Sequence, residues 1–149
     1  MRAGCVIGSI LLAVVAVPGE AGAAGELLGA WTAVEYHLAD GNTHRVAGTI
    51  FFTESNWQVL FFVLDGDGNP QRGSAEGGTY TLDGEELVFW HQHNLSIGRE
   101  LAGLEASPLR MTVRASDEAQ PEPTRVELLG DRLTLLFPSG NRMSFVRAS

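Results

Sequence analysis

The sequence has few of the groups that commonly carry chemistry. Its 149 residues include one cysteine and no lysine, and 18 acidic residues outnumber 10 arginines to give a formal charge of −8. Because no basic run is present, the chain has nothing that would attract a nucleic-acid backbone or an anionic membrane surface. Cys5 lies near the start, so the rest of the chain offers no disulfide, thiolate metal ligand or cysteine nucleophile.

Familiar catalytic motifs are also missing. The sequence contains no G-x-S-x-G or H-E-x-x-H motif, no phosphate-binding glycine loop and no dinucleotide fingerprint. We therefore expect no cofactor, and the motifs assign no catalytic residue. Glu85 and Glu86 are adjacent, but neighbouring strand residues point to opposite faces, so the two carboxylates are not expected to act as an acid–base pair.

The first residues have the pattern of a secretory signal peptide. Arg2 precedes an apolar stretch over residues 6–17, which is shorter than the roughly 20 residues of a membrane-spanning helix. Small residues at 21–23 form a cleavage site. We expect a signal peptide at residues 1–23, a single domain at residues 24–149, and a secreted or periplasmic protein with no integral membrane association after cleavage. An uncleaved anchor is the alternative, and Cys5 precedes the apolar stretch, which argues against lipidation.

The remaining sequence predicts an all-β domain. Short apolar, β-branched and aromatic segments alternate with turn residues, and many connections are short enough for hairpins. An antiparallel up-and-down β-barrel of eight or nine strands is favoured because closure removes exposed edges, and a β-sandwich is the alternative. Residues 115–123 are expected to form an exposed loop and residues 101–105 a helical turn. The expected strands cover residues 31–38, 48–53, 58–64, 78–82, 86–97, 109–115, 124–129, 132–137 and 142–147.

Several segments of this chain resemble a known family. The Leu-Gly-Ala-Trp sequence ending at Trp31 is similar to the Gly-x-Trp start of lipocalins. Residues 78–84, residues 130–135 and a closing Arg147 resemble the lipocalin-like (calycin) domains of bacterial exported proteins. The resemblance implies a barrel with one closed end and an open mouth that leads to an apolar cavity. It also implies a structural contact at the closed end between Trp31 and Arg147, or Arg142 if the register differs.

Two histidines are the most distinctive candidate site residues. In a regular strand His91 and His93 would share a face, because residues two apart point the same way. A metal would need a third ligand, such as His37, His44 or an acid, and the sequence shows none, so no metal site is predicted. A structural role or hydrogen bonding to a ligand remain open. The residues expected to line a ligand cavity are His91, His93, Phe89, Tyr80, Trp57 and Phe61.

One segment has part of the spacing of a calcium-binding loop. Asp65, Asp67, Asn69 and Glu76 stand at positions 1, 3, 5 and 12 of such a loop. Position 6 requires glycine for a sharp turn, but Pro70 occupies it and its φ is fixed at a negative value. We expect a polar hairpin loop at the rim of the barrel instead.

Two segments are apolar on both faces, which a solvated barrel wall does not require. They cover residues 50–52 and 59–64. Such a surface indicates an outer cover by a loop, a helix or a partner subunit, so a homodimer is one expectation.

Three functions remain open at this point. The first is an exported barrel that binds a small hydrophobic or amphipathic molecule in its cavity. The second is an enzyme on the same barrel, a cyclase, isomerase or hydrolase that uses a cavity histidine as a general base. The third is an interaction module with a filled interior and no ligand.

The signal-peptide expectation can be checked directly. The exported protein should begin at Ala24, and an Ala23→Leu substitution should block the cut because the cleavage site requires small residues. Intact-mass measurement of the exported protein reads the N-terminus. A full-length chain that begins at Met1 and stays with the membrane fraction would support the anchor instead.

Overall fold

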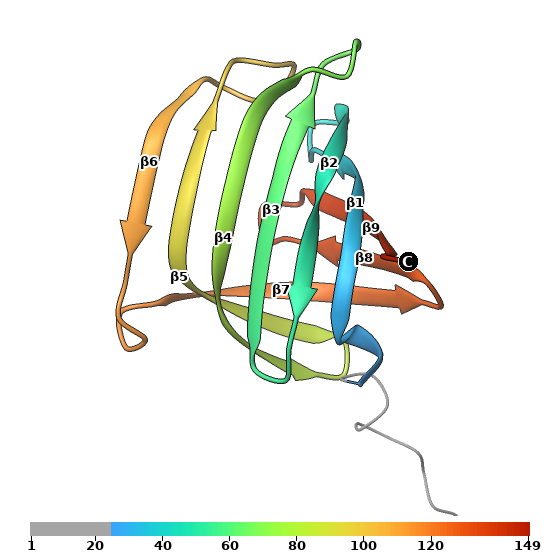
Figure 1. Cartoon of the computed structure of the whole chain (residues 1–149), viewed down its shortest axis with the longest axis vertical. Coiled ribbons are helices and arrows are strands. Elements are labelled where there is room, and N and C mark those ends of the chain that lie inside the picture. The colour runs from blue at the N-terminus through green and yellow to red at the C-terminus, as the bar shows by residue number, and fades with distance from the viewer. Residues whose placement is uncertain (1–24) are drawn as a thin grey trace, which may run out of the picture.

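The protein folds as an antiparallel β-barrel (Figure 1). The computed structural model describes residues 25–149, so the predicted signal peptide lies outside the described residues. No helix in residues 25–149 is long and apolar enough to cross a membrane. The strands are β1 (Gly29–His37), β2 (Thr43–Phe52), β3 (Asn56–Leu64), β4 (Pro70–Asp83), β5 (Glu86–Gly98), β6 (Ser107–Val113), β7 (Gln120–Leu129), β8 (Arg132–Leu136) and β9 (Arg142–Arg147).

Eight of the nine strands close into the barrel. Neighbouring strands pair in the order β4-β3-β2-β1-β9-β8-β7-β5, and β4 also pairs with β5 to complete the circle. The ninth strand, β6, pairs with β5 outside this circle (Figure 1). The predicted up-and-down barrel is therefore confirmed, and the alternative of a β-sandwich is wrong.

The first residues of β1 and the last residues of β9 contact each other at one end of the barrel. The guanidinium carbon of Arg147 lies 4.1 Å from the centre of the fully buried Trp31 ring. The Trp31 Nε1 group donates to the Leu27 carbonyl at 2.8 Å, and Arg147 Nη1 donates to the Leu28 carbonyl at 3.2 Å. The structure thus brings together the pair implied by the resemblance, whereas Arg142 pairs with His37 at the other end of β1.

A bulge in β5 determines which of its side chains face the interior. Gly78 of β4 lies opposite His91, but the preceding Gly77 lies opposite His93, so Gln92 is one extra residue on β5. The alternation of side chains therefore reverses at Gln92. The bulge also coincides with a change of partner, because β5 pairs with β7 up to His91 and with β6 from His93 onward.

Three local expectations were wrong. Strand β4 begins at Pro70 and not at residue 78. The composition of its first half is polar and rich in glycine, which suggests a loop, but hydrogen bonding to β3 and β5 makes this segment a strand. Strand β7 begins at Gln120, so part of the expected exposed loop pairs with β5. Residues 101–104 form a reverse turn closed by a bridge between Leu101 and Leu104, and not a helical turn.

The outer wall carries exposed apolar side chains. Phe51 is 52% exposed, Leu60 51% and Phe62 39%. Within residues 25–149, no loop or helix covers these side chains, so the homodimer stays a prediction.

The bulge depends on a glycine at position 78. A Cβ atom at Gly78 would lie 1.9 Å from the Trp90 carbonyl oxygen, which is far inside van der Waals contact. Gly78→Ala should therefore lower the free energy of unfolding by about 1 to 3 kcal/mol, as overpacking does. Urea unfolding measures this change.

The matched control is Gly66→Ala in the β3–β4 turn, where an added Cβ would contact nothing within 4 Å. It should change the stability by less than about 0.5 kcal/mol. Equal stability of the two variants would contradict the assigned role of Gly78.

Candidate functional site

The barrel has a partly open cavity beside its core. Large side chains such as Trp31, Leu87 and Leu133 are fully buried in that core. The cavity has a volume of about 180 Å³. An apolar cavity of about 150 Å³ is large enough to bind benzene, so this space accommodates a small molecule with one ring. Its apolar wall includes Ile50, Val59, Phe61, Phe89, Leu135 and Phe145.

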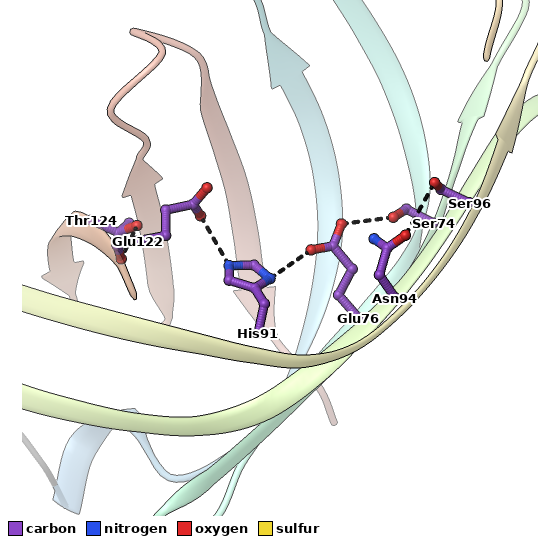
Figure 2. Close-up of polar contacts among 7 residues, drawn as sticks. All are labelled: Ser74, Glu76, His91, Asn94, Ser96, Glu122 and Thr124. Atoms are coloured by element: carbon purple, nitrogen blue, oxygen red, sulfur yellow. Dashed lines mark hydrogen bonds and ion pairs between the residues drawn. The ribbon is translucent and has the colours of Figure 1, made fainter. Parts of the chain in front are cut away.

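Three ionisable side chains from three strands meet at one side of the cavity. His91 of β5 points between Glu76 of β4 and Glu122 of β7 (Figure 2). The His91 Nδ1 atom lies 2.9 Å from Glu76 Oε2, and His91 Nε2 lies 3.5 Å from Glu122 Oε1. We call these three residues the Glu–His–Glu cluster.

Glu76 is held by several neighbours. Ser74 Oγ donates a hydrogen bond to Glu76 Oε1 at 2.8 Å, while the other carboxylate oxygen faces His91. Asn94 stands opposite Glu76 on β5 and lies beside it (Figure 2). Burial raises the pKa of Glu76, but the hydrogen bonds from His91 and Ser74 outweigh it, so the pKa lies below its usual value. Both oxygens of this carboxylate are therefore occupied by protein donors.

His91 holds its proton unusually tightly. Burial alone would lower its pKa, but the interactions with Glu122 and Glu76 raise the pKa from 6.5 to about 9. At neutral pH the side chain is therefore an imidazolium, and the Glu–His–Glu cluster has a formal net charge of −1. The stability contributed by this charge is fully present below pH 6.5 and is lost as the pH rises through about 9.

Two buried nitrogen atoms in the cavity wall lack a hydrogen-bond partner among the described residues. They are His91 Nε2 and Trp57 Nε1. The distance of 3.5 Å from His91 Nε2 to Glu122 Oε1 allows electrostatic attraction but exceeds the usual hydrogen-bond length of 2.7–3.2 Å. The Trp57 ring lies 5.0 Å from the His91 ring, centre to centre, so both nitrogen atoms belong to the same part of the wall.

The structure places four of the six predicted cavity residues in the cavity wall. These are His91, Phe89, Trp57 and Phe61. The other two, Tyr80 and His93, are placed elsewhere. Tyr80 packs against Phe52 in the core and donates to the Thr53 carbonyl at 2.7 Å. His93 lies on the exposed outer side, because the bulge at Gln92 reverses the alternation on which the shared face depended.

The other metal-ligand candidates do not join His91. His37 contacts Thr43 Oγ1 and His44 contacts the Ala102 carbonyl. Of the calcium-loop candidates, Asp65 accepts hydrogen bonds from backbone groups of its own turn, whereas Glu76 belongs to the Glu–His–Glu cluster. Within the described part of the chain, no group of three histidine, cysteine, aspartate or glutamate residues is arranged to hold a metal ion.

Sequence reasoning missed the two glutamates that define the polar side of the cavity. Glu76 lies in the part of β4 that was expected to be a loop, and Glu122 lies between two prolines in another expected loop. One signal was available for Glu122. It is in phase with Thr124 and Val126, whose side chains are buried in the barrel, so extending that strand backward would have placed Glu122 inside.

Comparison with known proteins identifies the fold. A lipocalin-like protein from Bacteroides uniformis ATCC 8492 aligns with a TM-score of 0.50 and 19% identity, over 83% of this chain and 100% of that chain. An uncharacterized protein from Bacteroides eggerthii DSM 20697 aligns with a TM-score of 0.48 and 14% identity, over 82% of this chain and 99% of that chain. Neither a protein-family model nor a curated protein matches. The chain has the lipocalin-like fold.

The charge state of His91 can be measured by NMR. The imidazole carbon-bound proton of His91 should titrate with a midpoint near pH 9 in the wild-type protein. Glu122→Gln should lower this midpoint by about 1 to 3 pH units because it removes a nearby opposite charge. A His91→Gln variant assigns the signal.

The matched control is Glu127→Gln, which removes the same charge from the exposed side of the same strand. It should leave the His91 midpoint unchanged. A wild-type midpoint near 6.5, or an equal effect of both variants, would contradict the proposed electrostatics.

Proposed function

We propose that this protein binds a small hydrophobic or amphipathic molecule inside its barrel. The observation that carries the proposal is the cavity of about 180 Å³, whose wall is mainly apolar and has one polar cluster on one side. Ligand pockets in proteins commonly combine an apolar wall with a few polar groups that orient the ligand. Burial of apolar ligand surface would contribute about 25 cal/mol per Å² to binding.

We also propose that the protein acts outside the cytoplasm. The charged start, short apolar stretch and small-residue cleavage site of residues 1–23 support export. A binding protein that is secreted or periplasmic would take up its ligand from the surrounding fluid and hold it in the barrel.

An enzyme is the second candidate, and the contact between Glu76 and His91 favours it. A carboxylate that accepts a hydrogen bond from Nδ1 fixes the ring and directs Nε2 toward a bound molecule. The raised pKa of about 9 makes His91 a proton donor at neutral pH, so it would serve as a general acid and not as the general base expected from the sequence. The cavity argues against a ligand-free interaction module.

Binding in the cavity can be tested with toluene as a small apolar probe. The protein has three tryptophans, and only Trp57 lies in the wall of this cavity within the described residues. Saturable binding of toluene should therefore shift the Trp57 indole N–H signal more than those of Trp31 and Trp90. Single substitutions assign the three signals in ¹H–¹⁵N spectra.

A pair of variants on β3 separates binding in the cavity from binding to the outer wall. Val59→Phe fills part of the cavity and should weaken toluene binding about tenfold or more, whereas Leu60→Phe changes an exposed neighbour and should have less than about a twofold effect. No saturable shift at Trp57, or equal effects of the two variants, would refute the proposed binding site.

A further inference from the structure

The polar side of the cavity has features that select among small ligands by charge. Glu76 already accepts hydrogen bonds on both oxygens, from His91 and from Ser74. By contrast, the Glu122 carboxylate and the Nε2 atom of His91 have no close hydrogen-bond partner among the described residues. They present one acceptor and one donor 3.5 Å apart.

A carboxylate ligand fits this pair poorly. It could accept a hydrogen bond from His91 Nε2, but it would lie beside Glu122, with Glu76 on the other side of the imidazole ring. The formal net charge of the cluster is already −1, and like charges in a partly buried site repel one another strongly. Fatty acids and aromatic acids are therefore disfavoured.

An ammonium ligand also fits poorly, although the net charge of −1 attracts it. It could donate to Glu122, but it has no acceptor for His91 Nε2–H. The N–H group of His91 would stay buried without a partner, which costs about 1–3 kcal/mol.

A hydroxyl group satisfies both atoms at once, because it is both a donor and an acceptor. Its oxygen would lie at the third corner of a triangle with His91 Nε2 and Glu122 Oε1, and the Glu122 side chain would have to shift to admit it, because Nε2 is buried. We propose that the cavity selects a small neutral alcohol or phenol, whose hydroxyl group accepts a hydrogen bond from His91 and donates one to Glu122. This inference rests on the proposed function, because it requires a ligand in the barrel.

The rest of the cavity supports a ring as the apolar part of that ligand. Trp57 and Phe89 lie next to His91, with their ring centres 5.0 Å and 6.3 Å from its ring centre. Aromatic rings prefer tilted and edge-on contacts of this kind. The volume of about 180 Å³ admits a single ring with a short substituent.

Four probes of nearly equal size test the selection. Toluene, benzyl alcohol, benzoate and benzylammonium share the phenyl ring and differ at one group. At pH 7, benzyl alcohol should bind about tenfold or more tightly than each of the other three, because a site that hydrogen-bonds a hydroxyl group rejects analogues that leave its polar groups unpaired. The Trp57 indole signal reports each dissociation constant.

Substitutions of Glu122 test whether the preference for benzyl alcohol depends on this side chain. Glu122→Leu should remove most of the advantage of benzyl alcohol over toluene and should improve benzoate binding, because the cluster becomes formally neutral. Glu127→Leu makes the same change on the exposed side of the same strand and should alter neither ratio. If Glu122→Leu does not fold, Glu122→Gln should still improve benzoate binding, since it removes the negative charge.

The outcomes separate this inference from the proposed function. If toluene binds at Trp57 but benzyl alcohol gains nothing over it, or if benzoate or benzylammonium binds best, the inference is wrong and the binding function survives. If none of the four probes binds in the cavity, both are wrong. A benzyl alcohol preference that Glu122→Leu and Glu127→Leu leave equally unchanged also refutes the inference.

Discussion

The one-residue bulge at Gln92 is the constraint on which the character of the cavity depends. His91 is in phase with the buried Leu87 and Phe89, and the bulge that follows it turns His93 out of the barrel where β5 leaves β7 and begins to pair with β6. Gly78 makes the bulge possible because no side chain fits against the Trp90 carbonyl there. A regular strand would have continued the original alternation and placed His93 inside. The bulge therefore leaves one imidazole of the pair in the cavity wall, where a regular strand would have placed two.

The proposed ligand selection accounts for the geometry of the Glu–His–Glu cluster. Burying a charge costs desolvation free energy, which only close pairing with an opposite charge offsets. Buried ion pairs are therefore often no more stabilising than apolar residues of similar size. In this cluster one contact is close, at 2.9 Å, and the other is loose, at 3.5 Å. The loose contact leaves a donor and an acceptor for the polar group of a ligand.

The sequence was a good guide to the barrel and a partial guide to the cavity. Alternating apolar residues and short turns identified all nine strands, since these patterns reflect local backbone preferences and burial. Strand pairing is not local, which is why the polar start of β4 and the proline-flanked Glu122 of β7 were expected to be loops. The sequence did not predict the bulge either, because a bulge is also a property of strand pairing. This bulge brings the backbone of Trp90 so close to Gly78, on another strand, that a side chain at position 78 would not fit. His91 could thus be singled out from sequence, but its two carboxylate partners could not.

A crystal structure with 3-bromobenzyl alcohol would test the central claim most directly, because anomalous scattering locates the bromine and ordered density locates the hydroxyl group. The account predicts the bromine inside the barrel against the apolar wall, and the hydroxyl oxygen within hydrogen-bond distance of both His91 Nε2 and Glu122 Oε1. Bromine bound only outside the barrel, or a hydroxyl group turned away from His91 and Glu122, would contradict it.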